Sequence, residues 1–308
     1  MRAQDPVIRR YGTAAVEEAA GIIRAGGIVA VPTETVYGLA ADARDSAAVA
    51  RIYAAKGRPS FNPLIVHVPD LAAAERLAVF DADARALATR FWPGPLTLVL
   101  PVRAEAGIAS LVTAGLDTIA IRVPAHRAMQ ALLAASGAPL AAPSANASNA
   151  ISPTRAAHVA ASLGGAVALI LDDGATATGV ESTIVAGRTI LRPGPVTAEM
   201  LGEVLPVAAG TTAHVSAPGQ LATHYAPRKP LRLMAVTPEA GEWLIGFGAV
   251  AGDDTLSASG DLEEAAARLF DALHRADASD RAGIAVAAVP ETGVGVAIND
   301  RLRRAAHR

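Results

Sequence analysis

The sequence predicts an α/β fold in two parts, a larger one over residues 1–206 and a smaller one over residues 231–308. Three observations predict this organisation. Apolar segments with helical spacing alternate with short apolar strands through the first two hundred residues. Residues 207–230 are mostly small residues, glycine and proline, which is typical of an interdomain linker. A second alternation of strands and helices follows this linker.

The helices of the larger part are expected where small and apolar residues recur every three or four positions. The first of them ends at Gly26 and Gly27, since glycine readily adopts the left-handed conformation that closes a helix. Thr154 is the expected cap of the last one. The predicted helices span residues 14–25, 47–55, 82–91, 125–135 and 155–163.

The strands of the larger part are short apolar runs that end at polar residues, glycine or proline. They are predicted at residues 28–31, 64–68, 96–100, 118–123, 166–171 and 182–185. The smaller part is predicted to have strands near residues 231–236, 243–247 and 283–289, and helices at 262–275 and about 294–306.

Composition excludes several kinds of site. The 308 residues include no cysteine, so disulfides, thiolate catalysis and cysteine-based zinc sites are excluded. The seven histidines show no H-x-x-x-H spacing, and no dedicated metal site is expected. No run of about 18 apolar residues predicts a membrane span. The N-terminal residues lack the apolar core of a signal peptide, so we expect a cytoplasmic protein without a membrane partner.

Net charge is −2 and is evenly distributed. Residues 1–206 carry 17 basic and 17 acidic side chains, and residues 207–308 carry 10 and 12. Neither part has the basic excess of a general nucleic-acid binder. Any site for an anion must therefore be a local cluster of basic residues.

The two lysines of the chain, Lys56 and Lys229, stand out among 27 basic residues. Lys56 lies two positions before Arg58 in a loop rich in glycine and proline. An ammonium and a planar guanidinium can neutralise one anion from two geometries. From this segment alone, a chance lysine on a solvated loop is an equal alternative.

Common nucleotide and hydrolase motifs are excluded. A P-loop requires a lysine followed by serine or threonine, but Gly57 and Pro230 follow the two lysines. The glycines at 293 and 295 begin a dinucleotide fingerprint, but Ile298 occupies the third glycine position. No G-x-S-x-G motif surrounds Ser144.

Five polar segments remain, and most of them follow a predicted strand. They cover residues 32–39, 56–64, 142–154, 181–183 and 191–195. Polar loops at strand ends are where open α/β sheets bind ligands. Each alone is most simply a turn. Together with the cations Lys56, Arg58, Arg122 and Arg192, they predict a cleft for a small polyanionic molecule.

These segments resemble the YrdC-like family. The resemblance rests on P-T-E-T-V-Y-G-L at 32–39, K-G-R-P at 56–59, N-P-L-I-V-H at 62–67, W-P-G-P-L-T at 92–97, T-I-A-I-R at 118–122, P-S-A-N at 143–146, E-S-T-I at 181–184 and L-R-P-G at 191–194. H-Y-A-P at 224–227 and N-D-R-L-R-R-A at 299–305 are similar to the longer, two-domain form. The resemblance implies a YrdC-like twisted open sheet with helices, followed by a smaller Rossmann-like α/β domain.

The activity that the resemblance implies is L-threonylcarbamoyladenylate synthesis. L-threonine, bicarbonate or CO₂, and ATP would give threonylcarbamoyl-AMP and pyrophosphate, for threonylcarbamoyladenosine in tRNA. Mg²⁺ would arrive with ATP, because it commonly binds through substrate phosphates. The product would pass to the tRNA threonylcarbamoyltransferase complex, and stable binding of tRNA by this chain is not expected.

The resemblance also assigns residues to roles. The catalytic set is Lys56, Arg58, Ser144 and Asn146. L-threonine contacts fall on Thr35, His67, Arg122, Ser144 and Ser182. ATP contacts fall on Lys56, Arg58, Asn62, Thr118, Asn146, Thr154, Arg192, and His224 or Tyr225. His67 could instead be a core histidine, and Thr118 and Thr154 could be ordinary strand and cap residues.

Two alternatives and two expectations accompany this interpretation. Some short YrdC-like proteins are associated with double-stranded RNA, but the balanced charge of residues 1–206 argues against such a module. The carbamoyltransferase of hydrogenase maturation needs cysteine-rich zinc modules that this chain cannot form. Residues 218–223 lack the basic residues of some longer members, which leaves phosphate contacts of the linker to His224, Tyr225 and Arg228. We expect the linker to form a lid over the cleft and residues 231–308 to support the site without chemistry.

Overall fold

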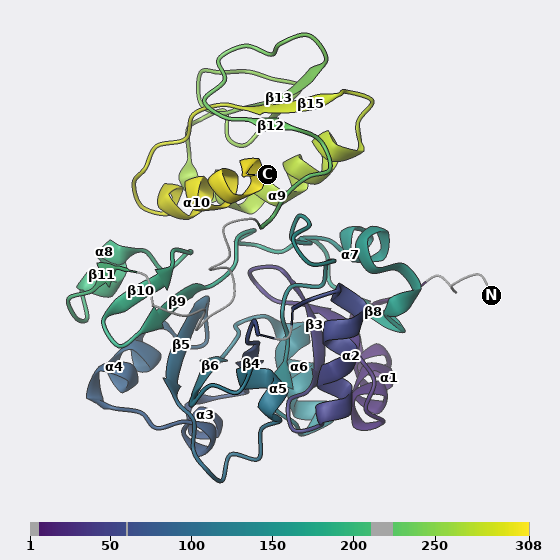
Figure 1. Ribbon diagram of the computed structural model, residues 1–308, viewed down its shortest axis with the longest axis vertical. Helices are drawn as coiled ribbons and strands as arrows, with labels where there is room; N and C mark the ends of the chain where they lie inside the picture. Colours follow the sequence, from purple (N-terminus) through teal and green to yellow (C-terminus); the bar gives the residue numbers. More distant parts are fainter. Residues whose placement is uncertain (1–5, 60, 211–223, 308) are drawn as a thin grey trace.

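Two β-sheets of unequal size organise the chain (Figure 1). Within residues 6–59, 61–210 and 224–307, which the computed structural model describes, one sheet has eleven strands in the order β1-β8-β2-β3-β7-β4-β6-β5-β9-β10-β11. The other has four strands in the order β12-β15-β13-β14. The predicted α/β fold with a smaller second α/β unit is thereby confirmed.

The larger sheet is mixed, with parallel and antiparallel pairs. Its strands are β1 (Val7–Arg10), β2 (Val29–Pro32), β3 (Tyr37–Asp42), β4 (Ile65–His67), β5 (Leu96–Pro101), β6 (Thr118–Arg122), β7 (Leu140–Ala141), β8 (Leu169–Asp172), β9 (Thr183–Ala186), β10 (Thr189–Arg192) and β11 (Ala208–Ala209). Its helices are α1 (Thr13–Arg24), α2 (Ser46–Lys56), α3 (Leu71–Leu77), α4 (Ala82–Phe91), α5 (Ser110–Thr113), α6 (Arg127–Ser136), α7 (Ala156–Leu163) and α8 (Ala198–Gly202).

Helices cover both faces of the first half of this sheet. Successive strand residues point to opposite faces, and the core divides in the same way. Val29 and Val31 of β2 pack with α1 and α6, whereas Ala30 between them belongs to the larger core with α2. A continuous apolar strand such as β2 is therefore buried on both sides, as expected for a layered α/β fold.

The second half of the sheet leaves one face for polar residues. Ile119 and Ile121 of β6 pack in the core with α3, α4 and α5. Ala120 belongs to a separate small apolar cluster on the opposite face. Arg122 has the same parity as Ala120, and it pairs in register with His67 of β4. The strands therefore direct two polar side chains side by side, away from the main core.

The smaller sheet is parallel throughout its described pairs. It consists of β12 (Leu231–Arg232), β13 (Glu242–Gly246), β14 (Asp254–Thr255) and β15 (Gly283–Val286), with helices α9 (Leu262–Ala278) and α10 (Gly295–Ala306). In Figure 1 both helices lie between this sheet and the larger part of the molecule. Their apolar faces pack with Val36, Ile151 and Val180 of the larger part in one core cluster.

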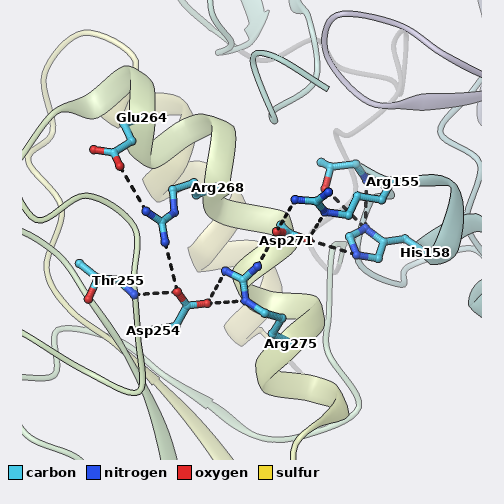
Figure 2. Close-up of polar contacts among 9 residues, drawn as sticks. Arg155, His158, Asp254, Thr255, Glu264, Arg268, Asp271 and Arg275 are labelled. Carbon is cyan, nitrogen blue, oxygen red and sulfur yellow. Dashed lines mark hydrogen bonds and ion pairs between the residues drawn. The ribbon is translucent and has the colours of Figure 1, made fainter. Parts of the chain in front are cut away.

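A charged network joins α7 to α9 (Figure 2). Asp271 of α9 accepts hydrogen bonds from Arg155 at 2.9 Å and forms an ion pair with His158 at 3.3 Å. The hydrogen bond with His158 and the charges of Arg155 and Arg275 hold the pKa of Asp271 well below its usual range. The ring of His158 also stacks on His274 of α9 with centroids 3.8 Å apart. Polar and apolar contacts thus fix the two parts against each other.

Most predicted elements are present with ends that differ by one to three residues. The helix at 82–91 matches α4 exactly in extent, and Gly26 closes α1 with φ of 76° as predicted. The strand expected at 166–171 starts later, at Leu169, because residues Gly164–Ala166 form a 3-10 turn. The strand expected to reach residue 289 ends at Val286.

Three predictions about local structure were wrong or incomplete. Residues 37–39 were assigned to a polar segment, but they belong to β3, which pairs antiparallel with β2. Thr154 does not cap α7; the N-cap is Arg155, and Thr154 instead contacts His158 through its backbone and hydroxyl. The short elements β1, α3, α5, β7, β10, α8, β11 and β14 were not predicted.

Gly179 lies where the backbone of the larger part closely approaches α9. It has φ of 70°, and a Cβ there would lie 2.3 Å from the carbonyl oxygen of Ala266 in α9. Gly174, in the same segment, has φ of 83° but no atom within 4 Å of the equivalent Cβ. We expect Gly179→Ala to lower the free energy of unfolding by about 1–3 kcal/mol more than Gly174→Ala, because only the former also overpacks the interface.

Urea unfolding of the two variants and the wild type measures this difference. Equal destabilisation by both substitutions would mean that the contact between residue 179 and α9 contributes nothing beyond backbone strain.

Candidate active site

A cavity lies where the polar segments converge. Strands β4 and β6 form its floor, and the turn between β2 and β3 and residues 224–225 of the linker form its walls. The lining residues are Thr33, Thr35, Val36, Gly38, Arg58, Ile65, His67, Arg122, Ala142, Pro143, Ser144, Glu181, Ser182, Arg192, His224 and Tyr225. Nine of the predicted site residues are among them: Thr35, Arg58, His67, Arg122, Ser144, Ser182, Arg192, His224 and Tyr225.

The turn between β2 and β3 is closed by its own threonines. The Thr33 hydroxyl donates to the carbonyl of Val36 at 2.7 Å and lies 2.8 Å from the hydroxyl of Thr35. Arg122 donates to the Thr35 hydroxyl at 2.9 Å and to the Gly94 carbonyl at 3.2 Å. The guanidinium is therefore held in one orientation, facing the turn.

Glu34 supplies a carboxylate to this guanidinium. Its Oε1 lies 2.6 Å from Nη2 of Arg122, and both side chains are largely buried. Burial by itself raises the pKa of Glu34, but the charge and hydrogen bond of Arg122 lower it below the usual value. Arg122 was predicted to bind a substrate carboxylate, and in this structure it binds a carboxylate of the chain itself.

His67 lies beside Arg122 in the register of β4 and β6. Burial and the neighbouring positive charge of Arg122 lower the pKa of His67 to about 3. The imidazole is therefore neutral at physiological pH. A neutral ring can donate and accept hydrogen bonds next to a cation without adding charge.

Lys56 is the last residue of α2, which ends where Gly57 adopts φ of 59°. Its ammonium donates to the backbone carbonyls of Ser144 and Asn146. Carbonyl oxygens do not neutralise the charge, and burial together with the nearby Arg58 lowers the pKa of Lys56 well below its usual value. An anion entering the cavity would compensate this charge.

Arg58 is held in a similar way. Its Nε and Nη2 donate to the carbonyls of Asn62 and Pro63, at 3.2 and 3.1 Å. Burial lowers the pKa of Arg58 to about 10, against partial compensation from Tyr53 and Tyr225. Backbone dipoles thus orient both basic side chains of the Lys56 loop without cancelling their charges.

The segment before β9 and the end of β10 are bonded to each other. Arg192 donates to the carbonyl of Ser182 at 2.9 Å and to its hydroxyl at 3.1 Å. The same hydroxyl lies 2.8 Å from that of Thr97. Ser152, in the loop before α7, donates to the carboxylate of Glu181. A predicted threonine contact and a predicted ATP contact are therefore adjacent.

His224 and Tyr225 reach the cavity from the linker, as the sequence predicted. Tyr225 has φ of 64°, its side chain is fully buried, and its ring packs 5.5 Å from that of Phe270 in α9. Burial raises the pKa of Tyr225 to about 12 and lowers that of His224 to about 3. The side chain of Tyr225 is anchored to the smaller part, while residues 211–223 of the predicted lid lie outside the described residues.

Unpaired buried atoms mark the places prepared for a ligand. Buried polar side-chain atoms normally have a hydrogen-bond partner. Among the described residues, six predicted site residues each have one buried side-chain atom that lacks a hydrogen-bond partner. These atoms are Asn62 Oδ1, His67 Nδ1, Asn146 Oδ1, His224 Nδ1, Tyr225 Oη and Arg122 Nη2, the last of which lies at ion-pair distance from Glu34.

Five predicted residues are not among those that line the cavity: Lys56, Asn62, Thr118, Asn146 and Thr154. Thr118 begins β6 and pairs with Pro101, about 13 Å along the strand from Arg122 at about 3.3 Å per residue. Thr154 is buried next to His158, two residues after Ser152. Their assignment to ATP stays a prediction. Arg228 of the linker donates to Asp277 of α9.

Comparison with known proteins identifies the family. The family model described as "Telomere recombination" (Sua5, YciO and YrdC) matches residues 21–194, which is more than half of the chain. The chain belongs to the Sua5/YciO/YrdC family. A second model, described as "Threonylcarbamoyl-AMP synthase, C-terminal domain", matches residues 196–307, so this member has the longer form.

Relatives of this family member extend over nearly its whole length. The threonylcarbamoyl-AMP synthase of Bacillus subtilis is 42% identical and covers 94% of this chain and 92% of its own. That of Pyrococcus abyssi is 42% identical over 93% of this chain and 92% of its own. The crystal structure of P. abyssi Sua5 with L-threonine superposes with a TM-score of 0.89, at 37% identity and 97% coverage of both chains.

Reasoning from the sequence missed three charged residues and one threonine of this family member's site. Glu34 and Glu181 stand inside motifs that were quoted, yet only their neighbours were selected. Arg301, which forms an ion pair with Glu181 at 3.0 Å, comes from α10. Thr33 lines the cavity directly. A signal was available for the two glutamates, because each stands in a polar segment of a cleft that is otherwise cationic.

Over the described ranges 6–59, 61–210 and 224–307, no group of three or more histidine, aspartate or glutamate side chains is arranged to hold a metal ion. None of the helices in those ranges combines the length and apolar character that a bilayer span requires.

The pKa of His67 predicts an acid sensitivity of the fold. The folded value is about 3 and the ordinary value is 6.5, so below pH 6.5 the unfolded chain binds a proton that the folded chain excludes. Stability should therefore fall as pH falls between these values, by about 1.4 kcal/mol between pH 7.5 and 5.5 for this histidine. His67→Gln should remove that share of the loss.

Urea unfolding at the two pH values provides the measurement. His307→Gln, which changes an exposed histidine, is the control and should keep the wild-type pH dependence. An unchanged pH dependence in His67→Gln would contradict a neutral, buried His67.

Proposed function

We propose that the chain is an L-threonylcarbamoyladenylate synthase. It forms threonylcarbamoyl-AMP and pyrophosphate from L-threonine, bicarbonate or CO₂, and ATP, which makes it a nucleotidyltransferase. The observation that carries the proposal is a single cavity with two kinds of polar surface. Arg122 and the hydroxyls of Thr35, Ser144 and Ser182 suit an amino acid, and the buried cations Arg58 and Arg192 of the same lining suit phosphates. Relatives named threonylcarbamoyl-AMP synthase support the same reaction.

L-threonine binds at the end formed by β4, β6 and the turn between β2 and β3. Its carboxylate replaces Glu34 on the guanidinium of Arg122, a pairing for which arginine is well suited. The carboxylate of Glu34 is then available to the substrate ammonium. Side-chain contacts come from Thr35, His67, Ser144 and Ser182. The neutral His67 adds a hydrogen bond without competing for the substrate carboxylate.

ATP binds at the end formed by the Lys56 loop, residues 143–146 and β10. Lys56, Arg58 and Arg192 surround the triphosphate, with Asn62 and Asn146 supplying polar contacts. Thr118, Thr154, His224 and Tyr225 complete the predicted set. Interactions of buried cations with phosphate are stronger than in water, because few water molecules screen them. The two ends meet at Ser144, whose carbonyl accepts from Lys56.

The reaction places two anions against each other. The amine of threonine adds to CO₂ and loses a proton, which gives a carbamate. A carbamate oxygen then attacks the α-phosphorus of ATP, and the bond from that phosphorus to the pyrophosphate oxygen breaks. Catalysis here consists of positioning and charge neutralisation by Lys56, Arg58, Ser144 and Asn146. No nucleophilic side chain is required.

Mg²⁺ enters as part of the ATP substrate. The carboxylates nearest the cavity, Glu34 and Glu181, are already paired with arginines. Coordination through phosphate oxygens fits this arrangement, since Mg²⁺ commonly takes few protein ligands in such sites. The product carries an activated threonylcarbamoyl group, which we propose is handed to the tRNA threonylcarbamoyltransferase complex in the cytoplasm.

Threonine-dependent pyrophosphate release is the direct test. The purified chain with ATP, Mg²⁺ and bicarbonate should release pyrophosphate when L-threonine is added, and mass spectrometry should detect threonylcarbamoyl-AMP. Serine should react less well, because a pocket fitted to one additional methyl group discriminates by about 1–3 kcal/mol. A folded chain that releases no pyrophosphate with L-threonine refutes the proposal.

The two lysines provide a matched pair of variants. Lys56 and Lys229 each donate to two backbone carbonyls, but Lys229 does so at the end of α9, to Ala276 and Ser279. Lys56→Met should reduce kcat by roughly 10²–10³-fold, the usual scale for losing one preorganised electrostatic contact. Lys229→Met should leave kcat near the wild-type value. Similar rates for both variants would remove Lys56 from the catalytic set.

A further inference from the structure

Arg301 is the largest fully buried side chain among the described residues. It comes from α10, yet every long-range contact that it makes lies at the edge of the cavity in the larger part. Its Nε donates to Oε2 of Glu181 at 3.0 Å, and its Nη1 donates to the carbonyl of Pro193 at 2.8 Å. The guanidinium also lies over the ring of Tyr225 at 5.4 Å. Burying an arginine is costly unless its partners are fixed.

These contacts hold the backbone next to two residues of the site. Glu181 immediately precedes Ser182, and Pro193 immediately follows Arg192. Ser182 and Arg192 are themselves bonded through the Ser182 hydroxyl and carbonyl. Arg301 therefore contacts the chain on both sides of this bonded pair. The network of Arg155, His158 and Asp271 shown in Figure 2 joins the two parts elsewhere, so Arg301 is not needed merely to attach α9 and α10.

The contact between Arg301 and Glu181 is electrostatic as well as structural, because Glu181 is charged. Its carboxylate is almost completely buried and accepts from Ser152 and Arg301. Arg192, His224 and Tyr225 of the cavity wall, and Lys56, are its other charged or titratable neighbours. Burial alone raises the pKa of Glu181, and the charges of Arg301 and Arg192 lower it below the usual value. If Arg301 were absent, the buried carboxylate would attract Arg192 most strongly.

We propose that Arg301 is a positioning residue that neutralises Glu181 and thereby keeps Arg192 directed at Ser182 and the phosphates of ATP. This inference rests on the proposed function, because it assigns Arg192 to ATP. It makes more specific the expectation that residues 231–308 support the site without carrying chemistry. In this chain the second part supplies a charge on which the geometry of the site depends.

Four variants test this role: Arg301→Met, Glu181→Gln, the double variant Glu181→Gln/Arg301→Met, and Arg303→Met. Arg303, which lies on the same helix as Arg301, is the control. It forms an exposed ion pair with Glu291. The measurements are kcat/KM for ATP in pyrophosphate release, calorimetric titration with ATP, and urea unfolding. Titration requires no turnover, so it reports on Arg301 separately from the proposed reaction.

Arg301→Met should lower kcat/KM for ATP by about 10²-fold, the scale of a small misplacement of a catalytic group, and should weaken ATP binding. The double variant should recover at least about tenfold of this loss, because no unpaired carboxylate remains to capture Arg192. Arg303→Met should stay within about twofold of the wild type. If the contact of Arg301 with Glu181 only held the two parts together, the double variant would have the same kcat/KM for ATP as Arg301→Met or a lower one. That result overturns the proposal.

The proposal is also overturned if Arg301→Met keeps kcat/KM and ATP affinity within about threefold of the wild type. If the wild type binds ATP but releases no pyrophosphate, the proposed function fails, and the titrations still decide the role of Arg301. A wild type that binds no ATP overturns both.

Discussion

The burial of cations around one cavity is the constraint on which the rest of this structure depends. Lys56, Arg58, Arg122 and Arg192 are each at most 9% exposed, and burying a charge is costly unless it is paired or well hydrogen-bonded. The chain meets this cost in two ways. Arg122 is paired with a carboxylate. Lys56 and Arg58 are held by backbone carbonyls, which orient their charges but leave them uncompensated. A site that must bind a polyanion benefits from the second arrangement, because the ligand then supplies the missing negative charge.

The sheet makes this arrangement possible by separating core from site at the level of single residues. The two isoleucines of β6 complete the apolar core on one face, while Arg122, on the other, reaches the cavity. The register that places His67 beside Arg122 would bring two like charges together if the imidazole were protonated. Burial keeps this histidine neutral. The packing that stabilises the fold therefore also sets the protonation state that the site requires.

The sequence could predict those features that arise within short segments. Alternation of helices and strands, the closing glycine after α1 and the cationic loop at Lys56 all depend on neighbouring residues, and the structure contains them. Residues 37–39 were misjudged because a turn rich in threonine precedes a strand that is short of β-branched residues. The partners of charged side chains were harder to predict. Arg301 and Glu181 are 120 residues apart in sequence, and no local pattern indicates that a helix near the C-terminal end contacts the segment before β9.

The pairing of Glu181 with Arg301 explains why a second unit can matter to chemistry that it does not perform. A buried ion pair contributes little net stability compared with apolar residues of similar size, but removing one partner is severe. Such a pair is therefore a poor choice for attaching two domains, and apolar contacts such as those of Val36 and Val180 with α9 would serve better. What the ion pair supplies instead is a positive charge at one defined position beside Glu181. Glu181 needs a cation to remain ionised without drawing in Arg192, and a cation from α10 can be present only when the two parts are docked. The proposed phosphate site would then keep its geometry only while the smaller part is docked. Tyr225, whose ring contacts Phe270 and Arg301, links residue 225 to the same interface.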